Sequence, residues 1–205
     1  MKPIFHKMSD GAYKKGNFVK LPVSFDIDKL QSATNELFTK VAWKQYTVKG
    51  LCMTQIPGDP SSADGDKLRG LFWTKPDSTG EEVQRENAID ESHYTEFVED
   101  FKGTYFEEVH NELSKKYKLG RFRLLLLEPR TSLSWHRDPE PRLHIPIFTN
   151  PGAHVVVDDR VKHLPADGGV WFTDTRNYHT VFNGGEENRI HLVATYLGEK
   201  KQWLN

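Results

Sequence analysis

The sequence predicts a mainly β fold of the jelly-roll type, braced by helices, and three observations carry this prediction. From residue 121 onward, short apolar or alternating runs follow one another: FRLLLLEP, RLHIPIFT, AHVVVDD, GGVWFTD, HTVFN and RIHLVATYL. Turn-forming residues separate these runs, for example Asn-Pro-Gly at 150–152 and Asn-Gly-Gly at 183–185. Short strands at such spacing are typical of an antiparallel sandwich or barrel. Aromatic residues make up 12% of the chain, which favours a packed β-rich fold over disorder.

Two helices are expected before the β-rich region. Residues 26–39 carry apolar side chains at helical spacing and predict an amphipathic helix. Residues 94–118 predict the longest helix of the chain, because aromatic or aliphatic residues recur there at every fourth position. Gly120 is expected to follow the end of that helix. Both helices would brace the sheet.

Two further segments precede residue 121. Residues 41–57 predict a strand, a turn at 49–50 and a second strand. Residues 57–92 are rich in Gly, Pro, Ser, Asp and Glu, and a connection of that length is usually functional or mobile. This segment is a candidate lid over a site, and a plain surface loop is an equally good interpretation.

Length and composition predict one domain over residues 1–205, with 1–120 as support and 121–197 as the β core. The 28 basic and 29 acidic residues leave no basic surface of the kind that binds nucleic acid. The single cysteine, Cys52, cannot form an intrachain disulfide. Neither a signal-peptide core nor a membrane span nor an Asn-x-Ser/Thr site is present in the sequence. We therefore expect a cytoplasmic protein without nucleic-acid or membrane partners.

The segment WHRDPEPRLHIPI, residues 135–147, concentrates ionisable residues in what otherwise reads as a strand. His136 and Asp138 are two positions apart, so in an extended chain their side chains point to the same face. Pro139 favours that extended conformation at Asp138. Two histidines and one carboxylate on one face of an octahedron are typical of non-haem Fe(II) oxygenases. His136 and Asp138 are thus candidate metal ligands, with a surface His–Asp pair as the alternative.

A second group of polar residues lies further along the chain, where His179 opens HTVFNGG and Arg189 opens RIHLVATYL. If these runs form one hairpin around Gly184-Gly185, His179 and Arg189 share a face about 13 Å apart. A small dicarboxylate bound to a metal at His179 would then reach the guanidinium of Arg189 and form a two-pronged pair. A structural salt bridge of Arg189 is the alternative interpretation.

Alternation in RLHIPIF places Arg142 and His144 on one face of a strand and its aliphatic residues on the other. Because His136 and Asp138 come shortly before, we expect the polar face to line a pocket. The alternative for His144 is a hydrogen-bonded core histidine.

The stretches WHRDPEPRLHIPIFTNPG and GGVWFTDTRNYHTVFNGGEENRIHLVATYL resemble the aspartyl/asparaginyl β-hydroxylase family of 2-oxoglutarate- and Fe(II)-dependent oxygenases, which includes bacterial free-proline hydroxylases. The resemblance covers residues 121–197 and rests on elements that fall in order: His-x-Asp, Arg-x-His-Ile-Pro, Gly-Gly-x-Trp, Asp-Thr-Arg, a histidine, and an arginine ten residues later. It implies a double-stranded β-helix, the jelly roll that cupins also have.

The resemblance also implies roles for individual residues. His136, Asp138 and His179 would bind Fe(II), and Arg189 would bind the distal carboxylate of 2-oxoglutarate. His144 would contact this cosubstrate near its metal-chelating end, and Arg142 would contact a substrate carboxylate. Family members located in the endoplasmic reticulum lack the metal-binding aspartate, so its presence here points toward the soluble proline-hydroxylase-like branch.

The implied activity is hydroxylation of an unactivated C–H bond in an amino acid or a peptide side chain, with O2 as oxidant and 2-oxoglutarate as cosubstrate. A cupin-like metal-binding protein with a hydrolytic, isomerising or ligand-binding role is the alternative function. A cation at position 189 discriminates between them, because 2-oxoglutarate needs one there and a non-redox cupin does not.

Overall fold

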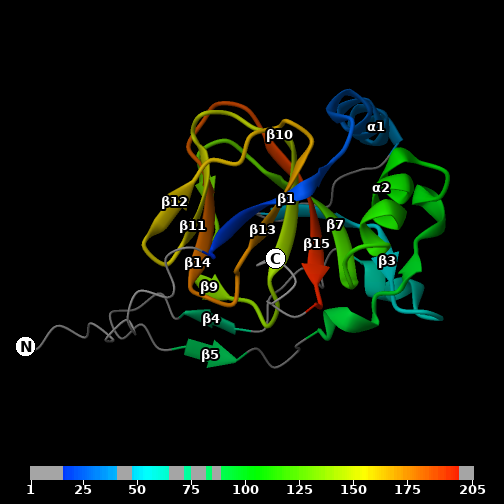
Figure 1. The fold of residues 1–205 in the computed structure, drawn as a ribbon, viewed down its shortest axis with the longest axis horizontal. Helices are drawn as coiled ribbons and strands as arrows, with labels where there is room; N and C mark the ends of the chain where they lie inside the picture. The colour runs from blue at the N-terminus through cyan, green and yellow to red at the C-terminus, as the bar shows by residue number, and fades with distance from the viewer. Residues whose placement is uncertain (1–15, 41–47, 65–71, 75–81, 85–88, 199–205) are drawn as a thin grey trace, which may run out of the picture.

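The computed structural model describes residues 16–40, 48–64, 72–74, 82–84 and 89–198. Two antiparallel sheets pack against each other, and two helices lie on the outer side of one of them (Figure 1). The six-stranded sheet has the order β1 (Phe18–Ser24), β13 (Gly169–Thr173), β10 (Arg142–Phe148), β15 (Arg189–Tyr196), β7 (Leu119–Leu127) and β2 (Val48–Cys52). The predicted jelly-roll type of fold is therefore confirmed.

The seven-stranded sheet has the order β12 (Arg160–Lys162), β11 (Ala153–Val157), β14 (His179–Asn183), β9 (His136–Arg137), β4 (Phe72–Thr74) and β5 (Glu82–Gln84), with β8 (Thr131–Ser132) beside β14. Strands β4 and β5 come from the segment that is a candidate lid, and β4 pairs with β9. Half of that segment lies outside the described residues, so its role as a lid stays a prediction. None of the described helices has the length and hydropathy of a membrane span.

Helices α1 (Ile27–Lys40) and α2 (Tyr105–Ser114) cover the outer face of the six-stranded sheet. The Asp26 side chain accepts a hydrogen bond from the Lys29 backbone N–H (3.1 Å) and so caps the start of α1. The buried residues of α1 and α2 recur at helical spacing. They form one apolar cluster together with alternate residues of the six-stranded sheet. The helix predicted at 26–39 is confirmed within one residue at each end.

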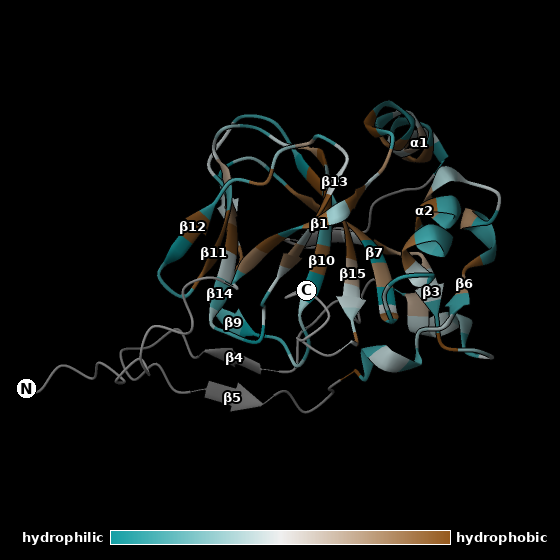
Figure 2. Cartoon of the chain, in the orientation of Figure 1, coloured by the Kyte–Doolittle hydropathy of each residue, from teal (hydrophilic) through white to brown (hydrophobic). Residues whose placement is uncertain are grey.

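Side chains alternate between the two faces of the six-stranded sheet, and Figure 2 shows brown and teal residues alternating along β7 and β10. The outer face carries aliphatic and aromatic residues, which join the cluster beneath the helices. The inner face, which looks toward the second sheet, carries mostly polar residues: Arg121, Arg123, Arg142, His144, Thr173, Arg189, His191 and Thr195. Between the sheets, a smaller apolar cluster packs next to these polar residues: Leu127, Val155, Val157, Leu164 and Val181.

The helix predicted at 94–118 is confirmed only over Tyr105–Ser114, and the eleven residues before α2 and the four after it are not α-helical. Strand β6 (Glu96–Phe97), which pairs with β3 (Thr54–Gln55), and the 3-10 helix η5 (Glu99–Phe101) occupy the part before α2. Gly103 has a φ of 72°, a left-handed conformation that ends the irregular part before α2 begins. The aromatic residues of both parts enter the same cluster, so a burial pattern shared by three elements looked like one helix.

Two turn predictions are also wrong. Strand β2 runs through Lys49 and Gly50, which pair with β7, so no turn lies there. Gly120 lies inside β7, where a Cβ atom would come within 2.4 Å of the Glu91 carbonyl oxygen. The glycine therefore permits a close backbone approach of the 3-10 helix η4 (Glu91–His93) rather than ending a helix.

The hairpin predicted around Gly184-Gly185 is wrong in its pairing. Strand β14 pairs with β11, β8 and β9, whereas β15 pairs with β10 and β7 in the other sheet. The turn therefore carries the chain from one sheet to the other. His179 and Arg189 belong to facing sheets and not to one strand pair.

Candidate metal centre

His136, Asp138 and His179 converge between the sheets. His136 on β9 and His179 on β14 are direct partners across the strand pair, and their ring centroids lie 4.1 Å apart. The Nε2 atom of His179 is 3.7 Å from Oδ2 of Asp138. One ligand atom from each of the three residues lies within 4.8 Å of the other two. The structure thus brings together the three side chains that the sequence singled out.

Backbone carbonyl groups hold both imidazoles in one orientation. The Nδ1 atom of His136 is 2.7 Å from the Ser134 carbonyl oxygen, and Nδ1 of His179 is 3.1 Å from the Asn177 carbonyl oxygen. Because a carbonyl oxygen only accepts, both Nδ1 atoms carry a proton, and Nε2 is the nitrogen of each ring that could bind a metal. Burial lowers the pKa of His179 to about 4, so this imidazole is neutral at pH 7.

Asp138 completes the donor set as an ionised carboxylate. Its backbone N–H donates to the Thr175 carbonyl oxygen (2.8 Å), and its Oδ2 lies 3.1 Å from Nε of Arg142. Burial alone would raise the pKa of Asp138, but the Arg142 guanidinium and the neighbouring imidazoles hold it well below its usual range. Two imidazoles and one carboxylate fit a divalent transition metal with further positions left open.

Arg189 is a buried cation on the inner face of β15. Its Nη2 atom donates to Nδ1 of His191 (2.8 Å), and within the described residues no carboxylate forms an ion pair with it. Burial without a nearby negative charge lowers the pKa of Arg189 to about 9. Because a buried charge is costly unless paired, this guanidinium fits a ligand carboxylate.

His144 and His191 face each other on β10 and β15, with ring centroids 5.7 Å apart. Burial and the Arg189 charge lower the pKa of both well below the ordinary value, so both are neutral. Since Nδ1 of His191 accepts from Arg189, its proton sits on Nε2, which is buried and has no partner among the described residues. The Nδ1 atom of His144 is likewise buried without a partner in that part of the chain. Sequence reasoning gave His191 no role, although alternation in RIHLVATYL placed it beside Arg189.

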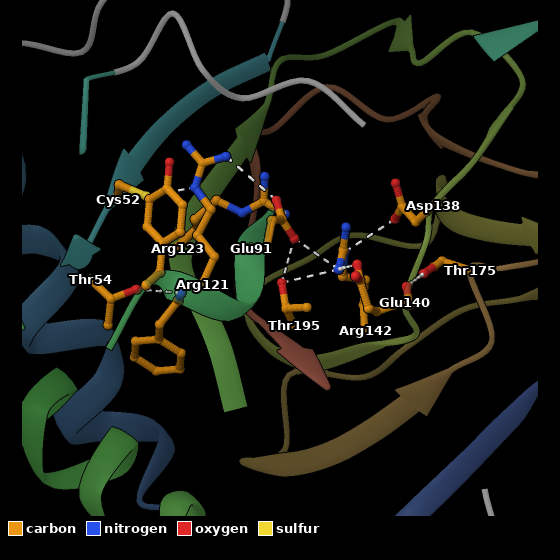
Figure 3. Close-up of polar contacts among 12 residues, drawn as sticks. Cys52, Thr54, Glu91, Arg121, Arg123, Asp138, Glu140, Arg142, Thr175 and Thr195 are labelled. Carbon is orange, nitrogen blue, oxygen red and sulfur yellow. Dashed lines mark hydrogen bonds and ion pairs between the residues drawn. The ribbon is translucent and has the colours of Figure 1, made fainter. Parts of the chain in front are cut away.

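Arg142 is engaged by residues of the chain itself, as Figure 3 shows. Besides Asp138, it contacts Glu91 (Nη1 to Oε2, 2.9 Å), Thr195 (Nη1 to Oγ1, 3.0 Å) and Glu140 (Nη1 to Oε2, 3.6 Å). Sequence reasoning missed Glu91, which has no local pattern around it. These contacts link Arg142 to Asp138, and the predicted contact of Arg142 with a substrate carboxylate stays a prediction.

Two imidazoles and one carboxylate between the sheets of a jelly roll are an arrangement typical of non-haem iron oxygenases. The chain belongs to the aspartyl/asparaginyl β-hydroxylase family, whose model matches residues 86–197, more than half of its length. By this family it is a hydroxylating enzyme. No curated protein matches the chain.

Three solved structures illustrate how distant the structural relatives are. A 2OG-Fe(II) oxygenase family oxidoreductase from Burkholderia pseudomallei is 14% identical, with a TM-score of 0.49 over 89% of this chain and 84% of that one. The viral collagen prolyl hydroxylase of Paramecium Bursaria Chlorella virus-1 is 11% identical, with a TM-score of 0.49 over 91% and 98%. A prolyl-4-hydroxylase from Pseudomonas putida is 10% identical, with a TM-score of 0.45 over 89% and 92%.

Proposed function

We propose that this enzyme hydroxylates an unactivated C–H bond of an amino acid or a peptide side chain, with Fe(II), 2-oxoglutarate and O2. One observation carries the proposal: a transition-metal donor set and an arginine without an acidic partner among the described residues face the same interior from opposite sheets. A dicarboxylate that chelates a metal with one end needs the metal at that end and a cation such as the arginine at the other. The name of the family supports a side chain of an amino acid as the substrate.

In this proposal His136 and His179 bind iron through Nε2, and Asp138 binds it through its carboxylate. When bound, iron would activate O2, which is the oxidant, and 2-oxoglutarate would supply two electrons and leave as succinate and CO2.

The chain's own groups would orient the cosubstrate. The guanidinium of Arg189 would bind the distal carboxylate through charge-assisted hydrogen bonds. The Nε2–H group of His191 is an additional donor beside it. His144 would contact the end of the cosubstrate that lies closer to the metal. The apolar cluster around Val155, Val157 and Val181 would keep water out of the same space.

Aromatic and basic side chains next to β9 support a contact surface for the substrate. Trp135, directly before His136, is 44% exposed, which is unusual for so large an apolar side chain. The guanidinium carbon of Arg137 lies 5.7 Å from the centre of the Tyr178 ring. These residues are positioned for contact with a peptide or amino acid that enters beside the metal.

The experiment is a two-part assay with purified protein, Fe(II), ascorbate and 2-oxoglutarate. Succinate formation without substrate tests the oxygenase chemistry, and a mass-spectrometric screen of free amino acids and short peptides for gain of one oxygen atom tests the substrate. We expect both signals to require 2-oxoglutarate and to be absent in His179→Ala. A folded protein that binds metal but forms no succinate under any of these conditions would instead support the non-redox alternative.

A further inference from the structure

Buried charged residues connect η4 to the metal centre (Figure 3). Glu91 in η4 is 5% exposed and lies against three buried arginines. Its Oε1 atom is 3.4 Å from Nη1 of Arg121 and 3.5 Å from Nη2 of Arg123, and its Oε2 atom is 2.9 Å from Nη1 of Arg142. Burial would raise the pKa of Glu91, but these arginines hold it below its ordinary value, so Glu91 is ionised.

Arg142 is shared between Glu91 and the candidate metal ligand Asp138. Its Nη1 atom points to Glu91 and to the Thr195 hydroxyl, while its Nε atom lies 3.1 Å from Oδ2 of Asp138. The Thr195 hydroxyl also donates to Oε2 of Glu91, so the three side chains form a closed set of contacts. Since a guanidinium is planar and rigid, fixing Nη1 also fixes the direction in which Nε points.

Other contacts hold Glu91 itself in place. The backbone of η4 lies so close to β7 that only glycine fits at position 120. The Asp90 side chain accepts from the Ser92 backbone N–H (2.9 Å), and the Tyr94 hydroxyl donates to the Ser62 carbonyl oxygen (3.0 Å). The backbone that carries the Glu91 carboxylate is therefore fixed in place. Glu91 lies 47 positions before Asp138 in the chain.

We propose that Glu91 is a positioning residue of the metal centre: it holds Arg142, and Arg142 in turn holds the Asp138 carboxylate in the orientation that the metal requires. The assignment rests on the proposed binding of iron by His136, Asp138 and His179. With an uncharged residue at position 91, Arg142 loses its closest acidic partner other than Asp138. Its charge then draws the Asp138 carboxylate toward itself and away from the metal. Partners that orient metal ligands typically affect metal affinity by about 10- to 100-fold.

The test measures binding of Co(II), which replaces Fe(II) without needing oxygen-free handling, by calorimetry and by its visible absorption spectrum. The set comprises the wild type, Glu91→Gln, Glu91→Asp, Arg142→Gln and the double variant Glu91→Gln/Arg142→Gln. We expect Glu91→Gln to weaken Co(II) binding by about tenfold and to alter the spectrum. We expect Glu91→Asp, which keeps the charge, to recover part of the affinity.

The double variant tests the route through Arg142. If Glu91 acts through this arginine, Glu91→Gln changes the Co(II) affinity by less than about twofold once Arg142 is already replaced. Effects that simply add in the double variant would overturn that route. A folded Glu91→Gln protein with the Co(II) affinity and spectrum of the wild type would overturn the whole assignment.

Two controls separate positioning from loss of stability. Leu113→Ala removes a fully buried side chain of α2 beneath the other face of the sheet, and we expect it to lower stability and leave Co(II) binding unchanged. If Glu91→Gln does not fold, Thr195→Val removes one contact to each of Glu91 and Arg142, and we expect it to weaken Co(II) binding by about threefold. Unchanged binding in that variant would count against the assignment.

Failure of the metal centre is distinguishable from failure of this assignment. Wild-type protein that binds no Co(II), or binding that persists in His179→Ala, would overturn the proposed function and the positioning role together. Binding that His179→Ala abolishes and Glu91→Gln leaves intact would overturn the positioning role alone.

Discussion

In strand β15, the two faces of the six-stranded sheet are equally buried but carry different kinds of residue. All eight residues of β15 are buried. Ile190, Leu192 and Tyr196 pack beneath the helices, whereas Arg189 and His191 face the second sheet. The outer residues join the apolar cluster, while among the described residues the inner ones include a His191 Nε2 without a partner and a cation without an acidic partner. Burial alone therefore does not distinguish residues that stabilise the fold from residues that could bind a ligand. The difference is whether their polar atoms already have partners within the protein.

The largest effect is expected from removing a ligand on the facing strand β14. His179→Ala should weaken Co(II) binding by more than about 100-fold, because loss of a ligand exceeds the effect of the groups that merely orient ligands. The metal-free variant should keep its fold by circular dichroism. Calorimetric titration with Co(II) measures the loss, and affinity within tenfold of the wild type would contradict the metal centre.

The next largest effect is expected at the face of the six-stranded sheet that the helices cover. Leu192→Ala should lower the free energy of unfolding by about 2–5 kcal/mol, since it leaves a cavity in the cluster beneath the helices. Denaturant unfolding of the metal-free protein measures this loss. Co(II) affinity should stay within about twofold of the wild type; a large change there would show that the two faces are not independent.

A smaller effect should distinguish binding of the cosubstrate from binding of the metal. Arg189→Met removes the charge but keeps most of the volume, and we expect the KM for 2-oxoglutarate to rise about 30-fold, or about 2 kcal/mol. Co(II) affinity should not change. In the wild type, 2-oxoglutarate should raise the unfolding temperature of the metal-loaded protein, and the variant should lose this stabilisation. An unchanged KM would refute the role of Arg189.

The smallest effect concerns the histidine that the sequence left without a role. His191→Leu removes the acceptor of Arg189 and the unpaired Nε2–H donor, and we expect the KM for 2-oxoglutarate to rise about fivefold, or about 1 kcal/mol. Steady-state assays of succinate formation measure it. Replacement of Leu192, the neighbouring residue on the opposite face, serves as the matched control, and its KM should equal that of the wild type.

Period-two patterns allowed the face of each strand to be predicted, but not its neighbours. Alternation in RIHLVATYL and RLHIPIF assigned Arg189 and His144 to the polar face, and the His-x-Asp spacing identified His136 and Asp138. The pairing around Gly184-Gly185 failed, because a glycine-rich turn permits a hairpin and a crossing between sheets equally well. Which strand lies beside which depends on tertiary packing that no local window contains.

The contacts between Glu91 and its arginine neighbours were even harder to predict from the sequence. Alternation in LGRFRLLLL could have placed Arg121 and Arg123 on the polar face of β7. Glu91 gave no such signal, since it lies in an acidic segment where one carboxylate looks like any other. Its importance comes from a close backbone contact with Gly120, which only the folded chain reveals.

The crossing of the chain between β14 and β15 has a consequence for selectivity among organic acids. The metal donors and the guanidinium stand on opposite walls, and packed sheets are about 10 Å apart. Valine and leucine side chains of the smaller apolar cluster pack between those walls. Under the proposed function, we expect the bulk of Val155 and Val181, which carry no charge, to affect the length of acid that fits. Smaller or larger aliphatic residues at these two positions should then shift the preference toward longer or shorter diacids, while every ionisable group stays as it is.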